Sequence, residues 1–160
     1  MLDRRTFLGT AAASVIGFAL LRAPGRTEAA ASFKVMHSDA EWLRILGRQR
    51  YDVLRHAGTE RAFTSPLLNE HRRGVFACAG CALPLFSSAT KFESGTGWPS
   101  FWRALPHATL EHADRSLLME RTEVLCSRCG GHLGHVFDDG PEPTGLRYCM
   151  NGLALSFRST

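Results

Sequence analysis

The first regular pattern of apolar and polar positions along the chain is helical. Residues 38–41, SDAE, form a capping box, in which the serine hydroxyl and the glutamate carboxylate satisfy backbone amides at a helix start. Apolar side chains between Trp42 and Leu46 then make one stripe, and residues 49–56 form a second helical run. Gly58 is expected to end that run as a C-cap. The pattern predicts short N-terminal helices followed by an extended arm.

From Gly74 onward the pattern changes to the two-residue period of β-strands. Residues 91–102, KFESGTGWPSFW, are rich in glycine and aromatic residues and predict a loop, and residues 138–144 predict a turn. Strands this short, with little helix beyond residue 58, predict a mainly β, antiparallel domain that is clamped by a metal. The expected strands cover residues 74–77, 117–120, 123–125, 133–137, 146–150 and 153–157.

Residues 1–31 differ in composition from the rest of the chain. Residues 4–8, RRTFL, resemble the twin-arginine export motif, an apolar stretch covers residues 7–21, and the alanines at 29–31 offer a cleavage site. We therefore expect a twin-arginine-type export signal over residues 1–31, a mature domain over residues 32–160 and a periplasmic location. The alternative is an uncleaved membrane anchor, although the apolar stretch is short for a spanning helix.

Length and charge narrow the class of protein. The 160 residues, 44% of them hydrophobic, suffice for one domain with its own core beside the extension. The formal net charge is +4, and it falls to +2 without residues 1–31. So small a charge gives no support for nucleic-acid binding, and contact with a membrane is expected only through the export signal.

The five cysteines divide into two C-x-x-C pairs and one single residue. The pairs are Cys78 with Cys81 and Cys126 with Cys129, and the single residue is Cys149. Because each short turn presents two thiolates, two pairs complete a tetrahedral zinc site. We expect one structural Zn²⁺ per chain, joining distant parts of one domain. The fifth cysteine is a candidate nucleophile, and the alternative is a buried structural cysteine.

Side-chain alternation along the expected strand places Cys149 beside polar side chains. If residues 146–151 are extended, Arg147, Cys149 and Asn151 share one face, whereas Tyr148 and Met150 point the other way. A guanidinium on the same face favours the reactive thiolate form of the cysteine. The Asn151 amide is expected to orient a polar group of a substrate.

Two histidines, His132 and His135, follow the second cysteine pair. One of them could replace a cysteine as a zinc ligand, or both could be satisfied within the core. The functional interpretation is a proton donor or hydrogen-bonding group beside Cys149, because histidine titrates nearest to neutral pH. The other histidines have no such company and are expected at the surface.

Trp98 stands in the glycine-rich segment over residues 95–101, GTGWPSF. Glycine allows backbone conformations closed to other residues, and the proline stiffens the segment after the indole. A rigid loop that presents a tryptophan suggests an aromatic wall for an apolar or sulfur-bearing ligand. The alternative is simple core packing of the indole.

Taken together, these motifs resemble those of the methionine-R-sulfoxide reductase B family. The resemblance covers residues 38–157 in colinear order. It rests on the first C-x-x-C pair, on SGTGWPSF over residues 94–101, on CSRCGGHLGHVFDDGP over residues 126–141, and on GLRYCMN over residues 145–151. The resemblance implies an antiparallel β-tent of two sheets with a structural zinc on the four paired cysteines.

The resemblance also implies a reaction and a set of roles. It implies reduction of the R epimer of methionine sulfoxide, free or in oxidised proteins, through a Cys149 sulfenic acid that a thioredoxin-like or other thiol reductant restores. Trp98 and Phe101 would contact the substrate. The remaining pocket residues implied are His132, His135, Arg147 and Asn151.

Two departures from the family pattern and two rival functions accompany this interpretation. Thr96 stands where many members carry a resolving cysteine, and Gly152 stands where a serine is common.

One rival function is a non-catalytic zinc-ribbon interaction module with an inert Cys149. The other is a thiol–disulfide oxidoreductase in which the C-x-x-C pairs are redox-active.

Overall fold

The computed structural model describes residues 33–115 and 120–160. Within these ranges no helix is long and apolar enough to cross a membrane. The export signal expected over residues 1–31 lies outside the described residues, as does most of the strand expected over residues 117–120.

The N-terminal helix α1 (Asp39–His56) begins with the predicted capping box. The Ser38 hydroxyl accepts the Glu41 backbone N–H at 3.4 Å, and a Glu41 carboxylate oxygen accepts the Ser38 backbone N–H at 2.9 Å. At Gly47 the backbone leaves the helical region, with φ 69° and ψ 164°. Because only glycine takes such angles readily, the helix breaks there into two runs, as the sequence pattern predicts.

The predicted C-cap at Gly58 is wrong by one residue. Ala57 takes the left-handed conformation, with φ 52°, and Gly58 donates its N–H to the Asp52 carbonyl at 3.0 Å. A Cβ on Gly58 would lie only 2.9 Å from that same oxygen. The glycine therefore allows a close approach of two backbone segments rather than a left-handed turn.

The smaller sheet has three antiparallel strands in the order β2-β1-β9. They are β1 (Gly74–Cys78), β2 (Pro84–Ser87) and β9 (Leu155–Ser159). The sequence pattern missed β2, which has four residues and begins at a proline. The segment expected as a strand over residues 153–157 starts later, because a 3₁₀ turn, η4 (Gly152–Ala154), precedes β9.

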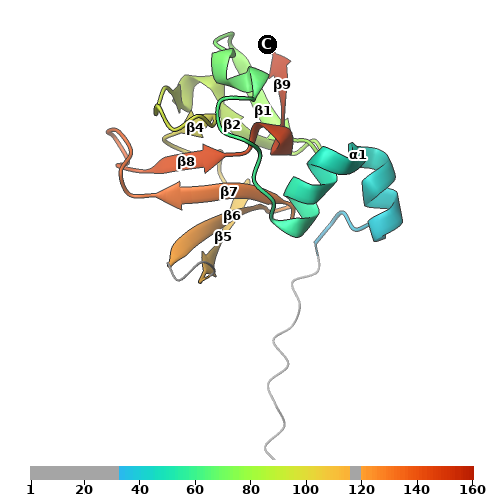
Figure 1. Cartoon of the computed structure of the whole chain (residues 1–160). Helices are drawn as coiled ribbons and strands as arrows, with labels where there is room; N and C mark the ends of the chain where they lie inside the picture. Colours follow the sequence, from blue (N-terminus) through green and yellow to red (C-terminus); the bar gives the residue numbers. More distant parts are fainter. Residues whose placement is uncertain (1–32, 116–119) are drawn as a thin grey trace, which may run out of the picture. The chain divides into compact units, whose positions relative to one another are not determined.

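The larger sheet has six antiparallel strands in the order β3-β4-β8-β7-β6-β5, and Figure 1 shows β8, β7, β6 and β5 side by side. Two of its strands, β3 and β4, have two residues each and lie in the segment predicted as a loop. The pattern also missed β5, because four of its six side chains are exposed and it shows no apolar alternation. The strands are β3 (Lys91–Phe92), β4 (Ser100–Phe101), β5 (Thr109–Asp114), β6 (Arg121–Cys126), β7 (His132–Phe137) and β8 (Arg147–Met150).

An aromatic cluster fills the space between the two sheets. Phe101 of β4 stacks on Phe86 of β2 with ring centroids 4.4 Å apart, and it meets Phe76 of β1 edge-on at 4.9 Å. The Tyr148 ring of β8 lies 5.7 Å from Phe86. These large buried rings join the two sheets through apolar contacts. The fold class, mainly β with two antiparallel sheets and N-terminal helix, is confirmed.

Helix α1 packs against β7 and η4 and covers one end of the larger sheet (Figure 1). Its Trp42 side chain is buried, and the Arg55 guanidinium lies 5.0 Å from the centre of the Trp42 ring. From the helix, an extended arm leads to the short 3₁₀ helix η1 (Pro66–Asn69). A further 3₁₀ turn, η2 (Ser88–Thr90), connects β2 to β3. The arm runs from the helix end to the site described below.

Candidate active site and metal centre

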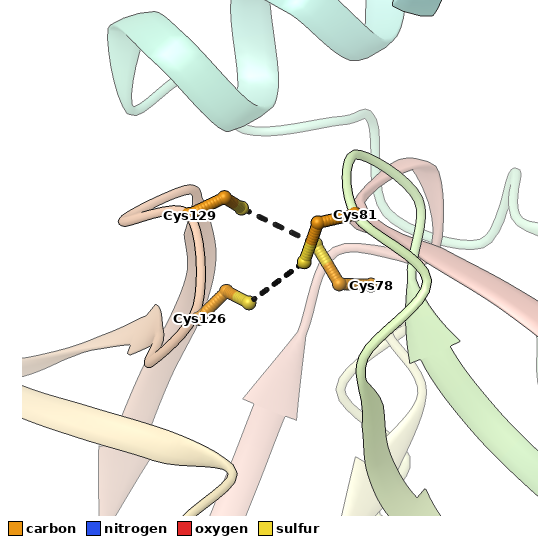
Figure 2. Close-up of side chains that lie close together, drawn as sticks. All are labelled: Cys78, Cys81, Cys126 and Cys129. Atoms are coloured by element: carbon orange, nitrogen blue, oxygen red, sulfur yellow. Dashed lines mark hydrogen bonds between the residues drawn. The ribbon is translucent and has the colours of Figure 1, made fainter. Parts of the chain in front are cut away.

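The four paired cysteines come from two turns that face each other (Figure 2). One turn follows β1 and the other follows β6, so each belongs to a different sheet. In the first turn the Ala82 N–H donates to the Cys78 carbonyl at 2.8 Å, and in the second the Gly130 N–H donates to the Cys126 carbonyl at 2.9 Å. Both turns end in a residue of positive φ, 58° at Ala82 and 67° at Gly130. The two segments are thus built alike although they lie far apart in the sequence.

The sulfur geometry fits one tetrahedral metal ion. The Sγ atoms of Cys78 and Cys129 are 3.7 Å apart, and those of Cys81 and Cys126 are 3.5 Å apart. All four sulfurs lie within 4.8 Å of one another. With Zn–S bonds of about 2.3 Å, the sulfurs of a tetrahedral site lie about 3.8 Å apart. The donor set and its spacing therefore suit a metal ion such as zinc.

The four sulfurs perturb one another, because hydrogen bonds, above all those with Cys126, lower the pKa of Cys81 and raise the pKa of Cys78 and of Cys129. Hydrogen bonds from neighbouring thiols lower the pKa of Cys126 to about 7, the bond with Cys129 having the largest effect. Outside the sulfur cluster, the Arg55 guanidinium donates to the Cys129 carbonyl at 3.0 Å, and Arg128 donates to the Cys81 carbonyl at 3.2 Å. These cations fix the turns from both sides and add positive charge near the thiols.

The fifth cysteine lies in the middle of the larger sheet. Cys149 of β8 pairs with His135 of β7 on one side and with Ser100 of β4 on the other. The neighbours Tyr148 and Met150 are buried on the opposite face, so the predicted alternation along this strand is confirmed. Cys149 itself is half-buried, and no disulfide involves it. Its thiol is therefore held at a fixed place with one side open.

A β-bulge brings the two histidines onto the same face of β7. The register between β6 and β7 shifts so that Leu133 has no partner on β6, and His132 and His135 point the same way although three positions separate them. Their ring centroids are 5.5 Å apart. Gly134, at φ 155°, lies within the bulge, where a Cβ would collide with the Cys149 carbonyl oxygen. The glycine thus lets β8 approach β7 at the position of the thiol.

Each histidine is paired with a carboxylate from another strand of the sheet, His132 with Glu123 of β6 and His135 with Asp114 of β5. Nδ1 of His132 lies 2.6 Å from Glu123 Oε1, and Nε2 of His135 lies 2.9 Å from Asp114 Oδ2. An ionised carboxylate only accepts, so these ring nitrogens carry the hydrogens. Arg121 holds Asp114 in turn, with Nη2 to Oδ2 at 2.6 Å. Both rings are therefore fixed in orientation by charged partners.

His132 is more deeply buried than His135. It is 4% exposed, and its Nε2 is buried without a hydrogen-bond partner among the described residues. Burial lowers the pKa of His132, and the hydrogen bond to Glu123 opposes that effect without cancelling it. The folded protein thus holds a proton on this ring less readily than the unfolded chain does, and the Nε2 nitrogen points away from Glu123.

A cavity of about 130 Å³ opens beside Cys149. The indole of Trp98 forms part of its wall, so this tryptophan lies beside the thiol. The Trp98 Nε1 hydrogen is donated to the Glu60 carbonyl at 3.1 Å, which holds the ring in place. The cavity is lined by Thr59, Trp98, Arg121, Gly134, His135, Phe137, Cys149 and Asn151.

Glu60, in the arm after α1, links several of these elements. Its backbone N–H donates to Asn151 Oδ1 at 3.0 Å, and its carboxylate accepts the N–H groups of Gly152 and of Leu153, the latter at 3.0 Å. Burial raises the pKa of Glu60, and the two backbone donors partly offset this. One residue of the arm therefore fixes both the Trp98 wall and the Asn151 amide.

Three of the residues expected at the pocket lie elsewhere or are engaged by the protein. The Arg147 guanidinium forms a forked ion pair with Asp139, at 2.8 Å for both contacts, and it does not line the cavity. Phe101 is fully buried in the aromatic core, because strand alternation turns it away from the face that carries Ser100. His132 is buried next to His135 rather than exposed in the cavity wall.

Asn151 does line the cavity, but its amide is already bonded within the protein. Besides the contact of its Oδ1 with the arm, one Nδ2 hydrogen goes to the Leu133 carbonyl at 3.3 Å. Its main effect is to tie the end of β8 to the arm and to β7. The five other histidines of the chain are exposed, as predicted.

Sequence reasoning missed four charged residues of this site: Glu60, Asp114, Arg121 and Glu123. Arg121 and Glu123 alternate along β6 on the same face of the sheet as the two histidines of β7. A correct pairing of β6 with β7 would therefore have found them. Asp114 belongs to the unpredicted strand β5. Nothing in the sequence pattern singled out Glu60, whose partners are 38 and 91 to 93 positions away.

Comparisons with known proteins agree with this fold and site. Residues 46–159 match the SelR domain family. The peptide methionine sulfoxide reductase MsrB of Thiobacillus denitrificans is 56% identical over 121 residues, which cover 75% of this chain and 92% of that protein. The MsrB proteins of Leptospira interrogans and Agrobacterium fabrum are 51% and 53% identical and are covered over 98% and 93% of their lengths.

The fold and site thus define a SelR domain, an antiparallel β-domain with a four-cysteine centre and a single free cysteine. Identities above half over most of the chain go further. The chain belongs to the MsrB family of peptide methionine sulfoxide reductases, a family of oxidoreductases.

Proposed function

We propose that this protein reduces the R epimer of methionine sulfoxide to methionine, in oxidised proteins and as the free amino acid. The observation that carries the proposal is the position of Cys149, whose thiol faces a small cavity between the Trp98 indole and the His135 ring. A cavity of about 130 Å³ accommodates one side chain of the size of methionine sulfoxide. The indole is suited to contact the methyl group and the sulfur.

The reaction follows from the groups around the thiol. The Cys149 thiolate attacks the sulfoxide, whose oxygen takes up a proton from the paired imidazoles His132 and His135. The oxygen forms a bond to the Cys149 sulfur as its bond to the methionine sulfur breaks, so methionine leaves and Cys149 is left as a sulfenic acid. Glu123 and Asp114 orient the two rings through these hydrogen bonds, and Glu123 favours the protonated form of His132.

The proposal also assigns roles to two arginines that lie near the reacting sulfur. Arg121 lines the cavity, whereas Arg147 lies on the strand that carries Cys149 and is held by Asp139. The hydrogen bonds to Asp139 raise the pKa of Arg147 most, and the neighbouring Cys149 raises it further. We assign Arg147 the role of a fixed positive charge beside the thiol and Arg121 that of a charge in the cavity itself.

The four paired cysteines are proposed to hold one structural Zn²⁺. They join a turn of the smaller sheet to a turn of the larger sheet, so the ion would fix the two sheets relative to each other. Such a role leaves no thiol of the pairs for redox chemistry, which argues against a thiol–disulfide oxidoreductase. The family of the chain argues against a non-catalytic zinc-ribbon module.

Recycling and location complete the proposal. A thioredoxin-like protein or another thiol reductant converts the sulfenic acid back to the thiol, with release of water and formation of a disulfide in the reductant. Residues 1–31 are proposed to direct export to the periplasm, with residues 32–160 as the mature domain. Fractionation of cells that make wild-type protein or an Arg4→Lys, Arg5→Lys variant tests the export signal, because loss of periplasmic protein in the variant is expected.

The central test uses a racemic methionine sulfoxide with dithiothreitol as the reductant. We expect consumption of half of the sulfoxide, with the S epimer left, and loss of turnover in Cys149→Ser. Turnover of both epimers, or full activity of Cys149→Ser, would contradict the proposal. A Ser127→Ala variant serves as control, since the half-buried Ser127 lies in the turn of the second cysteine pair and its hydroxyl donates to the His107 carbonyl rather than toward Cys149.

A further inference from the structure

A chain of three hydroxyl groups leads away from the Cys149 sulfur. The Thr96 hydroxyl lies 3.7 Å from Cys149 Sγ and 2.8 Å from the Ser94 hydroxyl. The Ser94 hydroxyl lies 2.7 Å from that of Ser100, which in turn reaches the Trp98 carbonyl at 3.1 Å. The chain therefore begins at the reacting atom and ends on the backbone of the tryptophan that forms the cavity wall.

Counting hydrogens shows that this chain has two complete arrangements. Each hydroxyl has one hydrogen to donate and two lone pairs. In the first arrangement Thr96 donates to the sulfur, Ser94 donates to Thr96, and Ser100 donates to Ser94. In the second, every hydrogen points the other way: Thr96 donates to Ser94, Ser94 to Ser100, and Ser100 to the Trp98 carbonyl. Thr96 then presents only lone pairs to Cys149.

The position of the chain favours a role beyond packing. Ser100 is 1% exposed and lies opposite Cys149 in the pairing of β4 with β8. A buried hydroxyl is costly unless it is bonded, and here each arrangement satisfies all three. The Thr96 backbone N–H also reaches the Ser94 hydroxyl, at 3.4 Å, which holds the turn in the same place in both arrangements.

We propose that Thr96 is a further catalytic residue, which donates a hydrogen bond to the Cys149 thiolate before the reaction and accepts one from the Cys149 sulfenic acid after it. Ser94 and Ser100 are positioning residues that supply Thr96 with either a donor or an acceptor. The proposal rests on the proposed reduction of methionine sulfoxide, and it gives Thr96 a function of its own at the place where many relatives carry a resolving cysteine.

The switch between the two arrangements conserves atoms and charge. The thiolate, the sulfoxide and one proton give methionine and the sulfenic acid. The oxygen now bound to Cys149 carries the hydrogen, and that hydrogen is donated to Thr96. The three hydroxyls rotate, and no proton enters or leaves the chain. The reductant later restores the thiolate, and the hydroxyls return to the first arrangement.

The test compares the wild-type protein with four variants under native, metal-bound conditions. Thr96→Val removes the hydroxyl while keeping the shape, and Thr96→Ser restores it. Ser94→Ala interrupts the chain without touching Cys149. The matched control is Thr122→Val, which removes a strand hydroxyl from the face of β6 opposite to the histidines. The charged and titratable groups that face Cys149, namely His135, Arg121 and Arg147, stay unchanged in all variants.

Two readouts are needed, and the first does not depend on sulfoxide reduction. The rate of Cys149 alkylation by iodoacetamide, measured from pH 5 to 9, reports the thiolate. We expect the rate at pH 7 to fall roughly three- to tenfold in Thr96→Val, as for loss of one hydrogen bond of ordinary strength, and to fall less in Ser94→Ala. Thr96→Ser and Thr122→Val are expected to match the wild type.

The second readout is the persistence of the sulfenic acid after one turnover without reductant, measured by delayed addition of dimedone. We expect its lifetime to be shorter in Thr96→Val and in Ser94→Ala than in the wild type. Wild-type alkylation and wild-type persistence in both variants would overturn the proposal and make the hydroxyls packing groups. A different outcome is a wild type that does not reduce methionine sulfoxide, together with an altered alkylation profile in Thr96→Val. That outcome would overturn the proposed function but would support the contact of Thr96 with the thiolate.

Discussion

The imidazole of His132 and the carboxylate of Glu123 form a buried pair across strands β7 and β6, with 2.6 Å between Nδ1 and Oε1. The pair combines two opposed effects, since burial lowers the pKa of His132 and Glu123 raises it. The carboxylate therefore decides both how the ring is oriented and how readily it holds a proton.

The first prediction concerns Glu123→Gln, which keeps the size of the side chain and removes its charge. The protonated form of His132 loses its counter-charge, so we expect kcat to fall roughly ten- to a hundredfold, within the usual contribution of a general acid. Steady-state kinetics with a sulfoxide substrate measures this. Glu111→Gln is the control, because Glu111 accepts from the Tyr148 hydroxyl on the opposite face of the sheet. Equal kcat values for the two variants would contradict the role of Glu123.

The second prediction concerns stability in acid. Because the pKa of His132 is lower in the folded protein than in the unfolded chain, the unfolded chain binds more protons at this site. The contribution is fully present above the unfolded pKa of about 6.5 and is lost as the pH falls below it. Urea unfolding at pH 7.5 and pH 5.5 should show a smaller loss of unfolding free energy in His132→Gln than in the wild type. An equal loss in both would show that His132 does not contribute.

The third prediction concerns the arm that carries Glu60. In Glu60→Gln one carboxylate oxygen becomes an NH₂ group, which cannot accept the N–H of Gly152 or of Leu153. We expect η4 to shift and the cavity wall to loosen, with KM raised severalfold and a changed Trp98 fluorescence. Glu142→Gln, at an exposed position, is the control. A raised kcat with unchanged KM would not fit this role.

The fourth prediction concerns the metal. We expect one zinc per chain in the wild type and in Cys149→Ser, and less than one in Cys126→Ser. Loss of the ion should lower Tm by more than about 10 °C, which corresponds to roughly 3 kcal/mol or more for a domain of this size. Elemental analysis and thermal unfolding measure the two quantities. Folded, active protein without metal would disprove the structural role.

The fifth prediction concerns recycling. The wild type has no second free thiol near Cys149, because the other cysteines of the chain lie together at the metal centre. After one turnover without reductant we expect a dimedone adduct at Cys149. In Thr96→Cys a disulfide with Cys149 is expected instead, since the Thr96 hydroxyl is 3.7 Å from Sγ. Thr122→Cys, on the other face of β6, should keep the adduct. Mass spectrometry showing a wild-type disulfide between Cys149 and a paired cysteine would overturn this account.

The sequence alone determined the local features of this protein. The capping box at Ser38, the two helical runs, the alternation along β8 and the two C-x-x-C pairs all depend on residues that are close in the chain, and the structure confirms each of them. Local spacing also sufficed to separate Cys149 from the paired cysteines. The resemblance to a known family, carried by short motifs, led to the correct family.

Only the tertiary structure decided which of these residues meet. The Leu133 bulge that turns both histidines to one face depends on the pairing of β7 with β6, and the carboxylates that hold them come from β5 and β6. Phe101 lies in the core, because strand alternation turns its ring away from the thiol. The Arg147 guanidinium binds Asp139, because an opposite charge lies within reach. Membership of a sequence motif did not reveal either contact. Glu60 contacts Asn151, which is 91 positions later in the sequence. Sequence periodicity records which face of an element is apolar, whereas contacts between distant polar groups are set by the packing of whole strands.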